Sequence, residues 1–139
     1  MVSNMIIREF NAKVEELPNV IGFVEEELKK YEFSSKVIMK LNLVIEEIFV
    51  NIASYAYKDS NGKCKIMIDY DKDKQEVKLS IEDNGIKFNP LEHQDPNTSS
   101  SIDDRTIGGL GIFLVKNNVD NIIYKYEDNK NILLLSKTV

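Results

Sequence analysis

Residues 41–52 read LNLVIEEIFVNI, and this stretch decides the fold. Its apolar residues recur at intervals of three and four, the period of one helix face, at Leu41, Val44, Ile45, Ile48 and Ile52. Ser34 or Ser35 can cap such a helix, so we predict that it runs from there to about Tyr57. Leu43 and Val50 lie on the opposite side. The helix is therefore apolar on two faces, and we expect it to be heavily buried.

Shorter elements surround this helix. The apolar spacing from Leu17 to Leu28 predicts an earlier helix from near Pro18 to Tyr31. Alternating or nearly alternating runs predict five strands, at residues 5–10, 65–70, 77–81, 122–126 and 132–135. Turns are expected at 59–62, 71–75 and 128–130, and a further helix at 109–118. With no internal repeat and no linker, we expect residues 1–139 to form a single domain.

Composition narrows the classes of function. The net charge is −5, whereas a nucleic-acid-binding surface is usually basic. We therefore expect a partner with a basic surface and no direct nucleic-acid binding. Cys64 is the only cysteine, so no intrachain disulfide can form, which is typical of a cytoplasmic protein. His93 is the only histidine, so a conventional zinc site is not expected. No apolar run reaches the ~18 residues of a membrane span.

The long helix carries a candidate catalytic pair, Glu47 and Asn51. At ~100° per residue these side chains lie one turn apart and can point into one site. An amide oxygen is a suitable Mg²⁺ ligand, and a carboxylate beside it can act as a general base. The alternative is that both are solvated helix residues. Periodicity also leaves a second strip open, formed by Asn42 and Glu46.

The triplet Asp83-Asn84-Gly85 follows a predicted strand. An aspartate at a strand end, directed into a cleft, can accept a hydrogen bond from an exocyclic amine such as that of adenine. A glycine two residues later lets the backbone approach a flat ring closely. The alternative is a plain Asn-Gly turn.

The third motif is Gly108-Gly109-Leu110-Gly111, at the start of the helix predicted for residues 109–118. Glycines there expose backbone N–H groups, and the helix dipole adds partial positive charge, so phosphate oxygens would bind well. No Gly-Lys-Ser/Thr follows, so the motif is not a P-loop. The alternative is a flexible loop.

A polar segment, Phe88 to Ile107, precedes these glycines. Its length without periodicity is typical of a functional loop. Arg105 near its end is a candidate for contact with a γ-phosphate or a partner, and a plain surface arginine is the alternative. The hydroxyl-rich tract 98–101 is explained by flexibility, with phosphorylation as a second interpretation.

The three motifs, in this order, resemble the GHKL (Bergerat-fold) ATPase superfamily and, within it, the small anti-sigma-factor serine/threonine kinases. The resemblance runs from about Ile6 to the C-terminus. It implies an α/β fold, a two-layer α+β sandwich with a mixed, mostly antiparallel sheet and helices on one face. ATP would bind between the helix layer and a lid formed by the loop before Gly108.

The resemblance also implies roles for individual residues. Glu47 matches the catalytic base and Asn51 the Mg²⁺ ligand. Asp83 and Gly85 match the adenine-binding pair, and the phosphate-binding glycines correspond to Gly108, Gly109 and Gly111. Two positions depart from the common pattern, since Tyr55 stands where the family often has histidine and Lys87 where it often has glycine. Residues 83–90, however, resemble an Asp-Asn-Gly-x-x-Phe-Asn-Pro variant of the anti-sigma kinases, in which Phe88 and Pro90 would shape the pocket.

The expected function is therefore that of a cytoplasmic, Mg²⁺- and ATP-dependent serine/threonine kinase. It would sequester a sigma factor or similar regulator and phosphorylate a Ser or Thr of an antagonist protein, and the resemblance implies a homodimer. The alternative is a non-catalytic ATP-binding switch that sequesters a partner. A third interpretation, the ATP-binding half of a histidine kinase, is disfavoured because the chain lacks phospho-acceptor helices.

Overall fold

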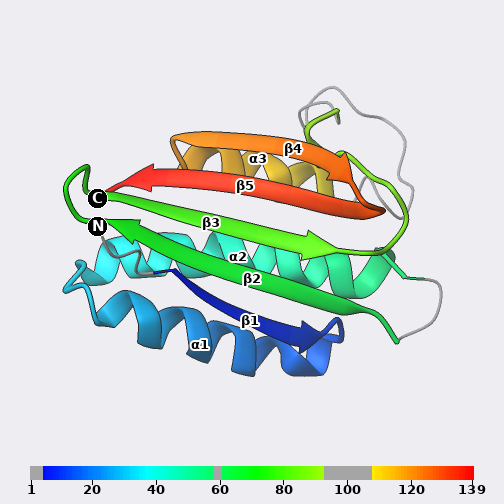
Figure 1. The fold of residues 1–139 in the computed structure, drawn as a ribbon, viewed down its shortest axis with the longest axis horizontal. Helices are drawn as coiled ribbons and strands as arrows, with labels where there is room; N and C mark the ends of the chain where they lie inside the picture. The colour runs from blue at the N-terminus through cyan, green and yellow to red at the C-terminus, as the bar shows by residue number, and fades with distance from the viewer. Residues whose placement is uncertain (1–4, 58–60, 93–107) are drawn as a thin grey trace.

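The computed structural model describes residues 5–57, 61–92 and 108–139. Its centre is a five-stranded sheet in the order β1-β2-β3-β5-β4 (Figure 1). The strands are β1 (Ile6–Asn11), β2 (Lys63–Asp71), β3 (Glu76–Asp83), β4 (Asn121–Glu127) and β5 (Lys130–Thr138). All neighbouring strands pair antiparallel. The sheet is thus antiparallel throughout, where the sequence predicted a mixed and mostly antiparallel one.

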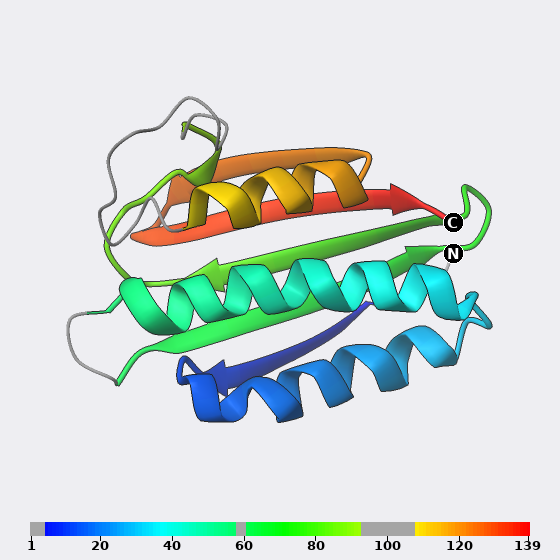
Figure 2. The same cartoon turned by 180° about the vertical axis from the view of Figure 1, so that it is seen from behind.

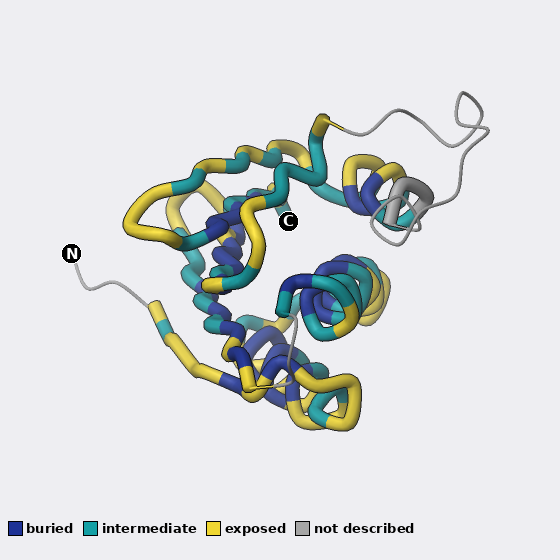
Figure 3. The backbone as a smooth tube through the Cα atoms, turned by 90° about the vertical axis from the view of Figure 1, so that its right-hand side faces the viewer, coloured by how far each residue is buried: buried dark blue, intermediate teal, exposed yellow. Residues whose placement is uncertain are grey.

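Within the described residues, the α-helices are α1 (Leu17–Lys29), α2 (Ser35–Tyr55) and α3 (Gly108–Asn118). All of them cover the same face of the sheet, as the view from behind and the edge-on view show (Figures 2 and 3). The predicted two-layer sandwich with helices on one face is therefore confirmed. Two short 3-10 turns, η1 (Val14–Glu16) and η2 (Pro90–Glu92), were not predicted. None of the helices in the described ranges is long and apolar enough to cross a membrane.

Helix α2 forms where its sequence pattern predicts. The Ser34 hydroxyl accepts a hydrogen bond from the Val37 N–H at 3.2 Å, which caps the helix. The predicted apolar stripe is buried against the sheet and the neighbouring helices. The expectation of heavy burial on the second face is wrong for Leu43, which is 37% exposed. Because the helices form a single layer, the outer side of α2 has no further layer to cover it.

The helix-facing side of the sheet supplies the other half of the core. Alternate residues of the central strands are buried, as expected for a sheet with one covered face, including Ile66 and Ile68 on β2, Leu79 and Ile81 on β3, and Leu133 and Leu135 on β5. Cys64 belongs to this set. Burial raises the pKa of its thiol well above the ordinary value, so Cys64 stays protonated and acts as a small core residue, as predicted.

The β4–β5 hairpin sets the register that matters for the site. Asp128 and Asn129 at its tip have φ of 54° and 61°, as in the two-residue turn that matches the twist of a hairpin. This turn fixes the alignment of β5, and β5 in turn pairs with β3 so that Asn131 lies opposite Asp83. The predicted turn at 128–130 is thus confirmed.

The turn after β3 touches the end of α2. The Ile86 N–H donates to the Ala56 carbonyl at 2.7 Å, and the Tyr57 hydroxyl accepts from the Asn84 N–H at 2.8 Å. A Cβ added to Gly85 would clash with the Ala56 carbonyl oxygen and Cβ. Gly85 is therefore required for close approach of the two backbones.

We predict that Gly85→Ala destabilises the fold by about 1–3 kcal/mol, the usual cost of overpacking, because its methyl meets the backbone of Ala56. Gly22→Ala is the matched control, since no atom lies within 4 Å of a Cβ at Gly22 on α1, and it should stabilise by about 0.5–1 kcal/mol. Urea unfolding measures both. A Gly85→Ala midpoint equal to that of the wild type would contradict the close approach.

Candidate functional site

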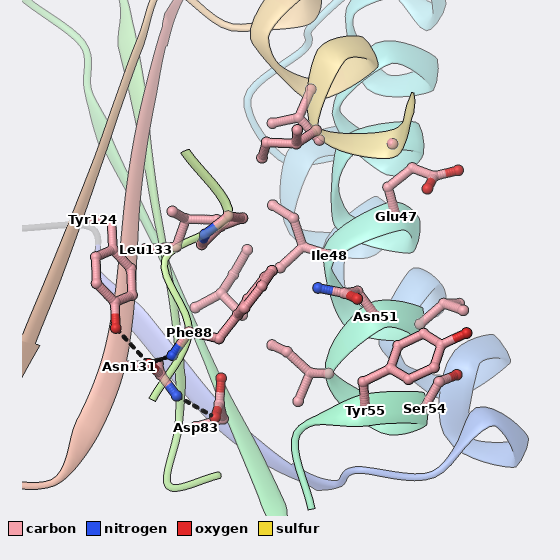
Figure 4. Close-up of a pocket in the computed structure, with 17 residues that line it drawn as sticks. Glu47, Ile48, Asn51, Ser54, Tyr55, Asp83, Phe88, Tyr124, Asn131 and Leu133 are labelled. Atoms are coloured by element: carbon pink, nitrogen blue, oxygen red, sulfur yellow. Dashed lines mark hydrogen bonds between the residues drawn. The ribbon is translucent and has the colours of Figure 1, made fainter. Parts of the chain in front are cut away.

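A cleft opens between α2, α3 and the adjoining ends of β3 and β5 (Figure 4). Its empty volume, which includes space open to solvent, is about 840 Å³. Most of its wall is apolar, from residues such as Ile48, Val50, Ile81 and Leu133. The wall also carries polar side chains from α2 on one side and from β3, β4 and β5 on the other, namely Glu47, Asn51, Ser54, Tyr55, Asp83, Tyr124 and Asn131. This combination is typical of a small-molecule site.

Asp83 lies at the end of β3, as predicted, and lines the cleft from the sheet side. It is 6% exposed. Its Oδ1 accepts hydrogen bonds from the Gly85 N–H at 2.9 Å and from the Asn131 side-chain amide at 3.0 Å. A carboxylate buried in this way needs such donors, because an uncompensated buried charge is costly. An ionised carboxylate in this position can only accept hydrogen bonds, so it suits a ligand that offers an amine.

The opposite wall carries Glu47 and Asn51 from α2. Both line the cleft, so the structure brings this pair, and not the Asn42/Glu46 strip, to the cavity. Asn42 instead donates to Glu25 of α1 at 3.5 Å. In Figure 4, Asn51 lies across the cleft from Asp83, and the Glu47 carboxylate points away from the sheet.

The Asn51 Oδ1 atom is buried and accepts no hydrogen bond from any described residue. A buried amide oxygen without a partner is unusual, and its position in the cleft wall leaves it available to a ligand. Amide oxygens are among the hard ligands that Mg²⁺ takes together with phosphate oxygens. The Asn51 oxygen is therefore a suitable ligand atom for a magnesium–nucleotide complex. Asn42 Oδ1 is also buried and has no hydrogen-bond partner within residues 5–57, 61–92 and 108–139, but Asn42 does not line the cleft.

The glycine motif lies in the first turn of α3, which begins at Gly108, one residue earlier than predicted. Gly108, Gly109 and Gly111 therefore contribute N–H groups to a helix start, where the first four have no intrahelical acceptor. Gly111 also lines the cleft. A Cβ on Gly111 would lie 2.5 Å from Glu47 Oε2, so the absence of a side chain lets the start of α3 approach the Glu47 carboxylate.

Other predicted positions divide into two groups. Phe88 and Pro90 line the cleft, as the sequence suggested, and so does Tyr55. Lys87 extends over the Tyr126 ring, with 5.1 Å from Nζ to the ring centre. The remaining predictions for the loop, namely Arg105, His93 and the tract 98–101, lie outside the described residues.

Sequence reasoning missed three polar residues of the site, Ser54 on α2, Tyr124 and Asn131. The Tyr124 hydroxyl and Asn131 Oδ1 are 2.5 Å apart, and both residues line the cleft. Tyr124 belongs to a regular strand pattern, and Asn131 lies just before the predicted final strand. The sequence does signal the β4–β5 turn, which fixes the register between these two strands. That Asn131 lies opposite Asp83, however, follows only once β5 is known to pair with β3.

Comparison with known proteins identifies the family. The chain matches the family described as histidine kinase-like ATPase domain over residues 10–137. This protein belongs to that family. The ATPase domain is 29% identical over 104 residues to the serine/threonine-protein kinase BtrW of Bordetella bronchiseptica, covering 75% of this chain and 72% of the relative. The predicted resemblance to the GHKL superfamily and its small serine/threonine kinases is thus confirmed.

The fold of the ATPase domain has a solved counterpart. It matches a crystal structure of the RsbU and RsbW domains of a Mycobacterium tuberculosis protein with a TM-score of 0.64 at 15% identity. The match covers 95% of this chain and 32% of that longer chain. At this identity the likeness establishes the fold alone.

The contact between Gly111 and Glu47 makes a prediction for the ATPase domain. Gly111→Ala should still fold, because its methyl meets the flexible end of a side chain. In a Glu47→Ala background it should stabilise by about 0.5–1 kcal/mol, the usual helix preference for alanine over glycine. In the wild-type background the gain should be smaller or reversed, because the methyl displaces the carboxylate. Urea unfolding of the four proteins gives the coupling free energy, and equal effects in both backgrounds would contradict the contact.

Proposed function

We propose that this domain is an ATP-dependent serine/threonine protein kinase of the anti-sigma type. It sequesters a transcription regulator and phosphorylates an antagonist protein. One observation carries the proposal: a single cleft brings together Asp83, the pair Glu47 and Asn51, and the glycine-rich start of α3. Asp83 can accept a hydrogen bond from a nucleotide base, Glu47 and Asn51 offer a carboxylate beside an amide oxygen, and the start of α3 offers N–H groups to phosphate. The similarity to the kinase BtrW supports the same activity.

At the adenine end, we assign Asp83 as the acceptor for the exocyclic amine. Its carboxylate is held from one side by Asn131 and by the Gly85 N–H. The neighbouring walls are apolar, formed in part by Ile81, Phe88 and Leu133, and can pack against the faces of a flat ring. Gly85 keeps the turn close to α2 and so keeps Asp83 in place.

At the phosphate end, we assign Asn51 Oδ1 as a Mg²⁺ ligand, because it is buried in the cleft wall without a protein donor among the described residues. Bound with ATP, Mg²⁺ would supply charge neutralisation for the phosphates. The N–H groups of Gly108, Gly109 and Gly111 are assigned to the phosphate oxygens. Arg105, outside the described residues, is proposed as a further phosphate contact.

Glu47 is proposed as the general base. A Ser or Thr hydroxyl oxygen of the antagonist attacks the γ-phosphorus, the bond to the ADP oxygen breaks, and the hydroxyl proton passes to the Glu47 carboxylate. The carboxylate lies on the side of α2 directed away from the sheet (Figure 4), where the side chain of a second protein can arrive. Gly111 sets its position from α3.

The proposed partners are proteins. The net charge of −5 suits basic surfaces on a sigma factor or similar regulator, and the second partner is the antagonist that carries the acceptor hydroxyl. The homodimer implied by the family resemblance also belongs to the proposal, and exposed Met39 and Leu43, one turn apart on α2, support it. We further propose that residues 1–139 act as one domain in the cytoplasm, consistent with a single, buried cysteine.

Phosphate transfer tests the proposal. Purified protein is incubated with Mg²⁺ and γ-labelled ATP together with candidate antagonists encoded near its gene, and the products are examined for phosphoserine and phosphothreonine. Labelled antagonist is the expected result. A protein that binds ATP and its partner yet labels no antagonist would favour a non-catalytic ATP-binding switch instead.

Two substitutions should separate chemistry from binding. Glu47→Gln keeps the shape of the side chain but removes the proton acceptor, so transfer should fall roughly 10²–10⁴-fold while ATP still binds. Asn51→Ala removes a metal ligand, so the affinity for Mg·ATP itself should fall. Calorimetry measures binding, and label transfer measures chemistry.

The same helix offers matched controls. Glu46→Gln changes a neighbouring glutamate that does not line the cleft, and Asn42→Ala removes the other unpartnered amide oxygen. Both should leave binding and transfer close to the wild type. A Glu47→Gln protein that transfers phosphate at the normal rate would exclude Glu47 as the base.

A further inference from the structure

Asn131 on β5 is a buried amide at the centre of a hydrogen-bond network. It is 6% exposed. Its Nδ2 donates to Asp83 Oδ1 and to the Ile86 carbonyl, both at 3.0 Å. Its Oδ1 accepts from the Phe88 N–H at 3.0 Å and from the Tyr124 hydroxyl at 2.5 Å. One side chain thus connects β3, β4, β5 and the turn that follows β3.

The orientation of this amide is fixed by its neighbours. A carboxylate and a carbonyl can only accept, so both must face the NH₂ group, and a backbone N–H can only donate, so it must face the oxygen. Flipping the amide would place oxygen against oxygen and nitrogen against nitrogen at these contacts. The arrangement therefore specifies asparagine: an apolar residue would leave buried polar atoms without partners, and aspartate would bring a second negative charge against Asp83.

The consequence concerns the direction in which Asp83 can hydrogen-bond to a ligand. A donor held against a carboxylate favours its ionised form, which accepts and does not donate. Adenine offers an amine at its six-position, whereas hypoxanthine and guanine offer a carbonyl oxygen there. An ionised, immobile carboxylate attracts the first and repels the second. A carboxyl that can take up a proton or rotate would discriminate less between them.

We infer that Asn131 is a positioning residue that sets the base specificity of the cleft: it holds Asp83 as an acceptor for an amino-purine and ties the Ile86–Phe88 backbone to β5 beside it. This inference rests on the proposed assignment of Asp83 to the adenine amine. Asn131 acts through Asp83 and through the backbone around the cleft. Substitution of Asn131 should therefore change the preference of the cleft for one base over another, in addition to any change in the stability of the fold.

The test compares ADP with inosine diphosphate, which differ at the six-position of the base, where the amine is replaced by a carbonyl. Calorimetry gives the dissociation constant of each in the presence of Mg²⁺. For the wild type we expect a preference for ADP of about 10- to 100-fold, the worth of one charged hydrogen bond, at every pH from about 6 to about 9.

Asn131→Asp is the main variant, because it keeps the shape of the side chain. Near pH 6 the two neighbouring carboxyl groups should share one proton, since they cannot both ionise easily, so Asp83 carries that proton for part of the time and can then donate to a carbonyl oxygen as well as accept. As the pH rises the second carboxyl ionises and faces Asp83 directly. The preference for ADP should therefore fall to about threefold or less at both ends of this range, near pH 6 because Asp83 can be protonated and near pH 9 because the second carboxylate repels Asp83 from its position.

Titration of neighbouring groups among the described residues should not account for this loss. Among the described residues, the ionisable groups on the elements around the pair are Tyr124 on β4, Cys64 on β2, Tyr57 after α2, the pair Glu82 on β3 and Lys130 on β5, and the exposed Glu92 at the end of η2. Burial raises the pKa of both tyrosines and of the cysteine above their ordinary values, so these three stay neutral to about pH 9. Asn121→Asp on β4 is the matched control: it makes the same chemical change at an exposed position and should behave as the wild type.

A second variant keeps the test decisive if Asn131→Asp does not fold. Tyr124→Phe removes only the hydroxyl that donates to the Asn131 oxygen, at a half-buried position. It should lower the ADP preference by about two- to fivefold, in the same direction and without a pH dependence.

The outcomes distinguish this inference from the proposed function. If variants at 131 and 124 weaken ADP and inosine diphosphate by one common factor at every pH, Asn131 is only structural and the inference is wrong. If the wild type does not prefer ADP, the adenine assignment fails and the inference fails with it. If the preference behaves as expected while no antagonist is phosphorylated, the inference stands and the kinase proposal fails.

Discussion

The contact between the turn after β3 and the end of α2 is the constraint on which the site depends. The Ile86 N–H donates to the Ala56 carbonyl, and the Tyr57 hydroxyl accepts from the Asn84 N–H. The two backbones lie so close that there is no room for a side chain at Gly85. The helix layer and the sheet are thereby joined at one edge of the cleft. Beyond this junction the layers are separated enough to leave the cavity between α2, α3 and the sheet.

A second constraint follows from placing a carboxylate at that junction. Asp83 is almost fully buried, and its stability there requires donors that water would otherwise supply. Asn131 and the Gly85 N–H provide them. Asn131 also satisfies the Phe88 N–H and the Ile86 carbonyl, so the network stabilises the fold and orients the site through the same atoms. On the opposite wall, Asn51 keeps a buried oxygen without a donor from the described residues, and this oxygen is the basis for its proposed role as a metal ligand.

Local patterns predicted much of this structure, and long-range pairing explains what they missed. The period of α2, its Ser34 cap and the β4–β5 turn each follow from a few adjacent residues, and each is confirmed. Periodicity could not choose between Glu47/Asn51 and Asn42/Glu46, because both strips have the same spacing and only the position of α1 distinguishes them. Leu43 was expected to be buried, but an apolar face shows only that burial is favourable, and here no second layer covers it. Asn131 required the β3–β5 register, which no short stretch of sequence contains.

The most direct test of the account is a nuclear magnetic resonance titration of the ¹⁵N-labelled domain with Mg·ADP. The account predicts the largest shifts at the backbone amide of Gly85 and at the side-chain amides of Asn131 and Asn51. Little change should occur at Ile7 and Ile123, which are exposed on the opposite face of the sheet. Shifts confined to that opposite face, with the Asn131 and Asn51 amides unmoved at saturation, would contradict it.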